Sequence, residues 1–302
     1  MITYFRDGFM DDKDASVSVR SRALNYGLGC FGGIRGYASD DGSDLFIFRL
    51  SKHAERLAIS AKTLCLPMRV SSARLEDIVC ELLRKNDVHA DCYVRPMVIS
   101  DSDELSPVLR EEDATLVVYT LPLARYIDKE ALDVCVSSWR RTSDNAIPSR
   151  LKPTGGYINS ALARREASDN GYDEAILLTE RGQVSEGSAE HLFMVQGGEL
   201  FSPPSTEDNL DGITRRSLIE LATEDLGLKF RERPIGRTEL YTADELFFCG
   251  TGAEIMPIAS VDRRTIGDGK PGPISSQIKS HFADVVRGRV ASRRSWLTPV
   301  WA

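Results

Sequence analysis

One interruption in the pattern divides this 302-residue chain into two parts. Between Pro122 and Ala131 the chain loses the alternation of apolar and polar residues that is typical of strands. Strand-like and helix-like segments occur on both sides of the interruption. The length also corresponds to roughly two domains of about 150 residues each. We therefore predict a small α+β domain over residues 1–121, a linker over 122–133 and a large α+β domain over 134–302.

Periodicity predicts the elements of the first domain. Apolar residues recur at helical spacing after Ser51, which is a suitable N-cap, and two β-rich segments precede it. A second helix and two further strands follow. The expected strands are 16–24, 44–50, 92–100 and 114–123, and the expected helices are 51–64 and 74–85.

The second domain is predicted in the same way. Gly171 and Gly227 each follow an amphipathic segment and are suitable helix stops. Glycines also mark the turns of two hairpins. The expected order is strand 132–141, helix 157–171, hairpins 173–186 and 191–204, helix 213–227, strands 243–250 and 254–262, and helix 274–287.

Composition excludes several classes of function. The net charge of −7 repels phosphate polymers, so we expect no nucleic-acid partner. No apolar run approaches the roughly 18 residues that span a bilayer, and the N-terminal stretch lacks the features of a signal peptide. Six cysteines and four histidines occur without metal-ligand spacing. We expect a cytoplasmic protein with reduced thiols, no metal site and no membrane partner.

Three glycine-marked loops could present backbone N–H groups to an anion. They are Gly155-Gly156, Gly212 and the stretch from Gly250 to Gly252, and the first two precede expected helices. A helix N-terminus or a loop lined by N–H groups binds phosphate through its unpaired donors. Ordinary turns explain each loop equally well when it is taken alone, because none has the spacing of a P-loop or Rossmann motif.

Three charged residues are further candidates. Lys152 lies between Pro148 and Pro153, in a segment that does not favour a helix, and a buried lysine there could form a Schiff base. Glu186 follows a turn in a strand-like stretch, and Arg56 flanks the apolar stripe of its helix. Solvent-exposed side chains are the alternative for each of them.

Taken together, these segments resemble a known family. The chain is similar to the branched-chain amino-acid aminotransferases, which belong to the class IV (fold-type IV) pyridoxal-phosphate enzymes, from about Tyr4 to Trp301. The strings that carry the resemblance are NYGLGCFGGIRGY, HAERL, YVRP, SSWRR, IPSRLKPTGGYINS, GYDEAILLTERGQVSEGSAEHLF, GITRRSLIELA and FFCGTGAEIMPI. The resemblance implies a two-domain fold of the D-amino-acid aminotransferase type.

The resemblance also implies a cofactor, pyridoxal 5′-phosphate (PLP), and a role for each candidate residue. Lys152, in the large domain, would be the Schiff-base lysine and would carry the proton between the substrate Cα and the cofactor C4′. Glu186 would keep the pyridine nitrogen protonated, so that the ring can accept electrons. Tyr157 would bind the phenolic oxygen of the ring. The phosphate would be held by Arg56, Gly212, Ile213, Thr214 and Thr251.

The same resemblance implies a substrate pocket. An apolar wall is expected from Tyr26, Phe31, Tyr93 and Tyr126, and the α-carboxylate is expected to bind Arg95, Thr251, Gly252 and Ala253. Read from the residues alone, the aromatic side chains could equally pack in a core. The chain departs from the family at Gly32, at Leu123 and in the acidic loop 100–106, and these departures affect substrate choice and leave the cofactor chemistry unchanged.

The expected function is therefore a ping-pong transamination. A branched-chain L-amino acid (leucine, isoleucine or valine) would donate its amino group to 2-oxoglutarate, and the enzyme would be a homodimer or a higher homo-oligomer. Three alternatives remain open. They are a D-amino-acid or (R)-amine transaminase, an aminodeoxychorismate lyase of the same fold, and a regulatory PLP-binding protein without turnover.

Overall fold

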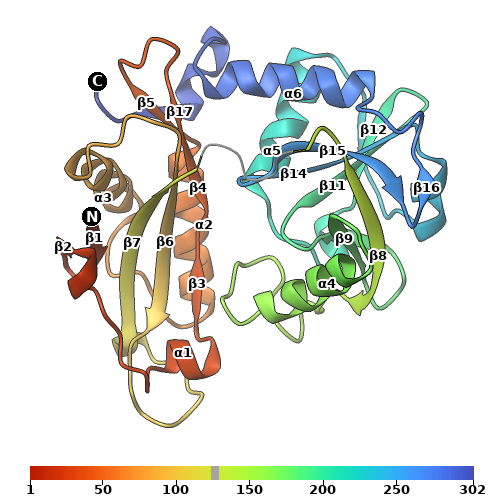
Figure 1. Ribbon diagram of the computed structural model, residues 1–302. Coiled ribbons are helices and arrows are strands. Elements are labelled where there is room, and N and C mark those ends of the chain that lie inside the picture. The colour runs from red at the N-terminus through yellow and green to blue at the C-terminus, as the bar shows by residue number, and fades with distance from the viewer. Residues whose placement is uncertain (124–128) are drawn as a thin grey trace. The chain divides into compact units, whose positions relative to one another are not determined.

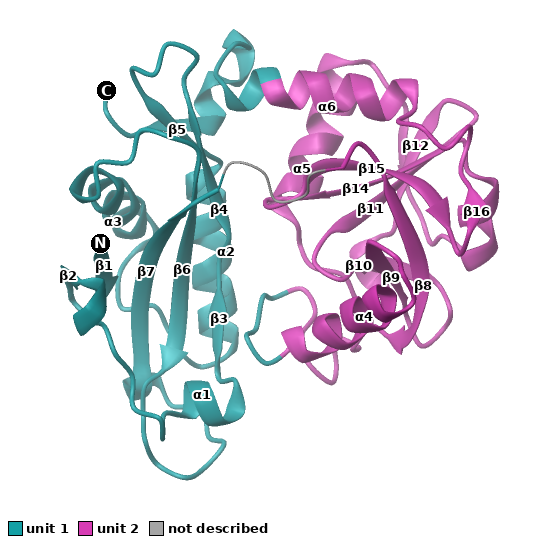
Figure 2. Ribbon diagram, in the orientation of Figure 1, with its two compact units in different colours: residues 1–124, 151–155, 284–302 teal, residues 125–150, 156–283 magenta. Residues whose placement is uncertain are grey.

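The computed structural model describes residues 1–123 and 129–302 as two compact units (Figures 1 and 2). Unit 1 is formed by residues 1–124, 151–155 and 284–302, and unit 2 by residues 125–150 and 156–283. Each unit is built on one large β-sheet.

An antiparallel sheet of eight strands forms the centre of unit 1. Its order is β17-β5-β4-β6-β7-β1-β2, and β3 pairs with β6 beside β4. The strands are β1 (Ile2–Phe5), β2 (Gly8–Asp11), β3 (Gly29–Phe31), β4 (Ile34–Ala38), β5 (Leu45–Phe48), β6 (Cys92–Ser100), β7 (Ala114–Pro122) and β17 (Leu297–Pro299).

Two long helices cover one face of this sheet. The helices of unit 1 are α1 (Arg22–Tyr26), α2 (Leu50–Thr63) and α3 (Ser72–Lys85). Alternate residues of β6 and β7, such as Val94 and Val118, are buried and share one core with Leu57 of α2 and Leu75 of α3. The period-2 pattern of the strands and the apolar stripes of the helices thus meet in a single core.

The structure confirms most of the predicted elements of unit 1, but not the strand at 16–24. Within that segment Val17 and Val19 are exposed, so the alternating pattern has no buried face. The hydroxyl of Ser21 instead accepts a hydrogen bond from the N–H of Leu24 at 3.3 Å and caps α1.

Ser51 is not the N-cap of α2, which begins one residue earlier than predicted. The N-cap is Arg49, with φ of +52° and no side-chain capping bond. Arg49 donates its N–H to the carbonyl of Trp296 at 2.7 Å, and its guanidinium lies 3.4 Å from the centre of the Trp296 ring. A partner distant in the sequence therefore fixes this helix start.

A mixed sheet of nine strands forms the centre of unit 2. Its order is β10-β9-β8-β15-β14-β11-β12-β13, with β16 paired to β15. The strands are β8 (Leu132–Arg140), β9 (Glu174–Leu178), β10 (Val184–Gly187), β11 (His191–Gln196), β12 (Glu199–Ser202), β13 (Phe230–Glu232), β14 (Glu245–Gly250), β15 (Glu254–Val261) and β16 (Arg264–Thr265).

The remaining long helices are α4 (Tyr157–Asp169), α5 (Ile213–Glu220) and α6 (Pro273–Val286). A small apolar cluster joins Ala163 and Ala167 of α4 to Cys135 of β8 and Leu177 of β9.

The predicted helix 213–227 is α5 continued by a π-helical turn over Leu221–Asp225. Short 3₁₀ turns occur at Asp12–Asp14, Glu111–Asp113, Ser205–Glu207, Arg237–Thr242 and Ala291–Trp296.

The predicted glycine turns of unit 2 are confirmed. Gly182 lies in the β9–β10 turn with φ of +79°, and Gly197 and Gly198 lie in the β11–β12 turn with φ of +58° and +77°. Gly171 follows α4 with φ of +71°. Each position lies in the left-handed region, which glycine adopts without a steric penalty.

The two units differ from the predicted domains in two places, because residues 151–155 and 284–302 belong to unit 1. The last strand, β17, pairs with β5, and residues 152–155 bond to the segment around β3. The described helices include none with the length and hydropathy of a membrane span.

Candidate active site

Backbone hydrogen bonds hold the segment that carries Lys152. The N–H of Phe31 donates to the carbonyl of Lys152 at 3.1 Å, and the N–H of Thr154 donates to the carbonyl of Gly29 at 2.9 Å. Between them, Pro153 forms an isolated antiparallel bridge with Cys30. The lysine therefore extends from a short length of chain that is added to β3, and this fixes its Cα.

Gly27 is required by a close approach of two backbones. Its carbonyl accepts from the N–H of Gly155 at 3.1 Å, and its φ is +66°. A Cβ on Gly27 would lie 2.9 Å from the Cα of Gly155. The absence of a side chain at Gly27 thus lets the lysine segment lie against the end of α1.

The ring of Phe31 lies near both the lysine and an arginine. The amine of Lys152 is 5.4 Å from the centre of the Phe31 ring, and the guanidinium of Arg95 is 4.4 Å from the same centre. The Nη2 group of Arg95 donates to the hydroxyl of Tyr93 at 2.8 Å. Gly33 is needed here, because a Cβ would lie 2.3 Å from that hydroxyl.

The guanidinium of Arg95 retains a free donor. Its Nε is buried and has no hydrogen-bond partner among the described residues. A buried donor without a partner is unfavourable in the isolated protein, and a carboxylate ligand would satisfy it. Of the expected substrate residues, unit 1 therefore brings Phe31, Tyr93 and Arg95 together. Tyr26 ends α1 and is 40% exposed, and Tyr126 lies outside the described residues.

Unit 2 holds a buried carboxylate on β10, the strand at one end of its sheet. Glu186, on β10, accepts from Nη2 of Arg141 at 2.8 Å through Oε1 and from the N–H of Leu210 at 3.2 Å through Oε2. Nδ1 of His191 lies 3.5 Å from the same Oε2. An adjacent guanidinium and backbone N–H favour the ionised carboxylate, which is the form that a protonated pyridine nitrogen would pair with.

A second acidic residue, Glu190, follows Glu186 closely in the sequence, and its carboxyl group has a raised pKa. Glu190 is buried, and this burial, together with the charge of Glu174, raises the pKa of its carboxyl group to about 8. Burial also raises the pKa of Glu174. Burial thus favours the neutral form of the Glu190 carboxyl group.

The N-terminus of α5 provides a second binding element in unit 2. Its N-cap is Gly212, which has no side chain to satisfy the N–H groups of the first turn, and the following Ile213 and Thr214 are buried. A Cβ on Gly212 would lie 2.0 Å from Nε2 of His191, so only glycine fits. The first turn of α5 is thus able to bind an anion.

The other expected binding residues are placed as follows. Arg56 is a buried cation on α2 in unit 1. Tyr157 is the first residue of α4, and Thr251, Gly252 and Ala253 form the turn between β14 and β15, in unit 2. The sequence did not single out Arg141 or His191, although Arg141 lies in the string SSWRR and His191 in the string SAEHLF.

Each unit separately supplies groups that fit PLP chemically. A fixed lysine amine can react with an aldehyde, and a carboxylate supported by arginine suits a pyridine nitrogen. A helix N-terminus without a capping side chain and a buried arginine suit a phosphate. Lys152 and Arg56 belong to unit 1, whereas Glu186 and Gly212 belong to unit 2.

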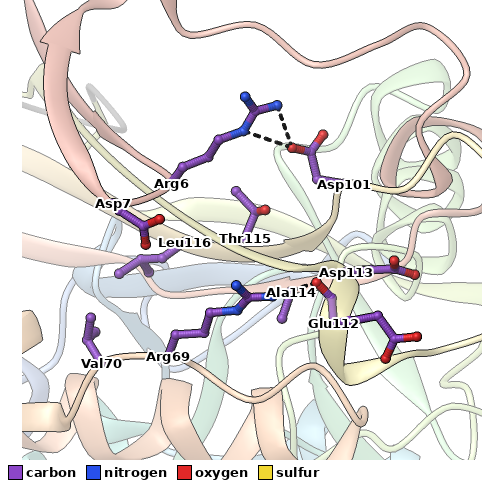
Figure 3. Close-up of a pocket in the computed structure, with 10 residues that line it drawn as sticks. All are labelled: Arg6, Asp7, Arg69, Val70, Asp101, Glu112, Asp113, Ala114, Thr115 and Leu116. Atoms are coloured by element: carbon purple, nitrogen blue, oxygen red, sulfur yellow. Dashed lines mark hydrogen bonds and ion pairs between the residues drawn. The ribbon is translucent and has the colours of Figure 1, made fainter.

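A polar pocket elsewhere in unit 1 has different chemistry (Figure 3). Arg6 bonds to Asp101 at 3.0 Å through Nη2, and Arg69 donates to the carbonyl of Glu112 at 2.5 Å. These cations are engaged by the two ends of the loop between β6 and β7. The pocket therefore serves to anchor that loop.

Comparison with known proteins agrees with this chemistry. A sequence profile of the family described as "Amino-transferase class IV" matches residues 29–261, and the chain belongs to this family of class IV aminotransferases.

Within that family, the chain is similar to the branched-chain enzymes over nearly its full length. It is 40% identical to a "Probable branched-chain-amino-acid aminotransferase" of Aquifex aeolicus, covering 99% of this chain and 96% of that one. A branched-chain aminotransferase of Thermoproteus uzoniensis, solved with norvaline, is 40% identical, covers 99% of both chains and has a TM-score of 0.95. The holo form of a branched-chain enzyme of Thermobaculum terrenum, solved with PLP, is 37% identical, covers 99% of this chain and 98% of that one and has a TM-score of 0.94. The predicted family and fold class are confirmed.

Proposed function

We propose that the chain is a PLP-dependent transaminase that transfers the amino group of leucine, isoleucine or valine to 2-oxoglutarate by a ping-pong mechanism. The observation that carries the proposal is the arrangement in unit 1, where Lys152 lies beside Phe31 and the buried, unsatisfied Nε of Arg95. An amine, an apolar ring and a carboxylate-binding donor are what an apolar amino acid requires. A further branched-chain relative, 36% identical and solved as a complex with N-(5′-phosphopyridoxyl)-L-glutamate, supports the acceptor.

Each cofactor-binding residue has a role in this proposal. When bound, PLP supplies an electrophilic carbon and a ring that withdraws electrons. Nζ of Lys152 holds the cofactor, then takes the proton from the substrate Cα and later gives it up. Glu186 pairs with the pyridine nitrogen and Tyr157 with the phenolic oxygen. The phosphate is bound by Arg56, Gly212, Ile213, Thr214 and Thr251.

The substrate is held by a second set of residues. Arg95 and the turn Thr251-Gly252-Ala253 bind the α-carboxylate, and Tyr26, Phe31 and Tyr93 contact the side chain. Gly32 is closely packed, because a Cβ would lie 2.9 Å from Cγ of Pro96. A side chain at this position would displace the proline next to Arg95. Glycine therefore leaves the carboxylate-binding arginine undisturbed.

A panel of amino donors with 2-oxoglutarate tests the proposed reaction. We expect kcat/KM for leucine, isoleucine and valine to exceed that for D-alanine by at least about a hundredfold, since a site built for one enantiomer leaves polar groups unpaired with the other. Product chirality should be measured in the reverse direction. A preference for D-alanine would indicate a D-amino-acid transaminase, release of pyruvate from aminodeoxychorismate would indicate a lyase, and no turnover of any donor would indicate a regulatory protein.

We also propose that the enzyme is a homodimer, or a higher oligomer built from it, in which the acidic loop 100–106 contacts the second subunit. This loop is firmly held, because the fully buried Arg22 forms ion pairs with Glu104 and Asp113. It nevertheless presents Leu105, which is 83% exposed. Val19 and Leu24, beside Arg22 in the sequence, are also exposed. Contiguous exposed apolar patches mark interfaces, and in this proposal Leu105 contributes the apolar side chain of the loop to such a patch.

Leu105→Glu should therefore dissociate the oligomer and lower kcat/KM by about tenfold or more, since a buried interfacial charge without a partner is unfavourable. Sedimentation velocity at micromolar concentration, together with leucine kinetics, measures both effects. Ile59→Glu, at an exposed apolar position on α2, is the matched control and should change neither. An active monomer of the unchanged protein would contradict the proposal.

The cysteines support a cytoplasmic location. All six are free, and all except Cys65 are buried. Burial raises the pKa of Cys30 to about 12 and the pKa values of Cys92 and Cys135 to about 11, so these thiols remain protonated. Unpaired thiols are typical of proteins in a reducing compartment.

A further inference from the structure

His191 occupies a central position in unit 2 that the reaction described above does not use. It is the first residue of β11 and is 5% exposed. It pairs with Cys249 of β14 in the sheet register, so its backbone is fixed on that side. A buried histidine at the edge of a binding site has either a packing role or a chemical one.

One side of the His191 ring faces the carboxylate of Glu186. Nδ1 lies 3.5 Å from Oε2 of Glu186, an ion-pair distance that is longer than the usual N–H···O hydrogen bond of about 2.7–3.2 Å. The other oxygen of Glu186 is held at 2.8 Å by Arg141. Apart from His191, the Oε2 atom has a contact of 3.2 Å with the N–H of Leu210. The two oxygens are thus held from different directions, and His191 acts on the more weakly held one.

The other side of the ring faces the N-terminus of α5. Nε2 occupies the space in which a Cβ of Gly212 would lie. The imidazole therefore separates the carboxylate of Glu186 from the first turn of α5. In the proposed function these two elements bind opposite ends of the cofactor, the pyridine nitrogen and the phosphate.

We propose that His191 is a positioning residue, whose Nδ1–H group donates to Oε2 of Glu186 and fixes the rotation of that carboxylate toward the pyridine nitrogen. The inference rests on the proposed role of Glu186. Arg141 contacts one oxygen at 2.8 Å, and the N–H of Leu210 contacts the other at 3.2 Å. A side-chain group on the second oxygen restricts the remaining rotation of the carboxylate, and small errors in the position of such a group lower rates by up to about a hundredfold.

Three substitutions of His191 distinguish the effect of losing the hydrogen-bond donor from the effect of losing the ring. His191→Asn places an amide nitrogen near the position of Nδ1, and His191→Gln places one near that of Nε2. His191→Leu removes both donors. We expect the kcat for leucine to remain within about threefold in His191→Asn and to fall by about 10- to 50-fold in His191→Gln and His191→Leu. KM and the dissociation constant of PLP, measured by reconstitution of the apoenzyme, should change by less than about threefold.

A spectroscopic measurement provides a readout independent of turnover. The pH midpoint of the visible absorption band of the bound cofactor reports the electronic state of the ring. In His191→Leu and His191→Gln this midpoint should move in the same direction as in Glu186→Gln, and in His191→Asn it should stay in place. A packing role would instead lower the melting temperature of all three variants and leave the midpoint unchanged.

A double-mutant cycle completes the test. In the Glu186→Gln background, His191→Leu should lower kcat by less than about twofold, because the group that it positions is gone. An equal loss in both backgrounds, or full activity of His191→Gln together with loss in His191→Asn, would overturn the inference. Near-normal activity of Glu186→Gln alone would refute the proposed role of Glu186 itself, and this separates the two failures.

Discussion

Lys152→Ala should lower kcat by several orders of magnitude, because the substitution removes both the group that holds the cofactor and the base that takes the Cα proton. Borohydride reduction of the unchanged holoenzyme should attach a pyridoxyl group to the peptide that contains Lys152, and peptide mapping by mass spectrometry measures this. The fold should persist, since the neighbouring hydrogen bonds of residues 152–155 are made by backbone atoms.

A control variant and a chemical rescue test the role of Lys152. Lys62→Ala, at an exposed position on α2, is the matched control and should retain full activity. Added methylamine should partly restore turnover in Lys152→Ala, because it replaces the missing amine. Trapping of the cofactor on any lysine other than Lys152 would contradict the assignment.

Glu186→Gln should lower kcat by about 10²- to 10³-fold while the affinity for PLP changes much less, because the amide keeps the shape and removes the charge opposite the pyridine nitrogen. The variant also leaves the guanidinium of Arg141 without its carboxylate. Both side chains are mostly buried, at 8% and 13% exposure, so the melting temperature should fall as well. Single-turnover kinetics and thermal unfolding measure the two effects.

Glu190→Gln is the matched control for this substitution. The pKa of Glu190 is raised to about 8, so at pH 6.5 its carboxyl group is already neutral, and an amide replaces it with little change in charge. We expect less than about a threefold change in kcat at that pH. If the two amide variants behaved alike, Glu186 would have no special role in the chemistry.

The sequence predicts the local elements of this fold well where one periodic face is buried. Helix α3 and strands β6 and β7 follow their apolar patterns closely. The predictions that are wrong concern segments in which the apolar pattern does not decide the structure. The first residue of α2 depends on Trp296, and the segment before α1 has no buried face, so that Ser21 caps a helix in place of the expected strand.

The candidate site likewise contains residues that the sequence predicts and residues that it does not. Lys152 and Glu186 are found from the sequence because they occur in extended strings that resemble a family. His191 is not found, because a single histidine at the start of a strand carries no spacing signal. Its contact with Glu186 arises from the irregular register between Val184 and Glu186 in β10 and from the pairing of β11 with β14. Such registers are set by three-dimensional packing.

The pairing of β17 with β5 has a consequence for biosynthesis. Strand β17 leaves the ribosome roughly 170 residues after β7 ends, a delay of about 10 to 35 s at typical elongation rates. During that interval β5 has no neighbour on its outer side, and the nascent first unit presents an open sheet edge. Chaperones that shield exposed strands would therefore matter most for this protein while its second unit is still being translated.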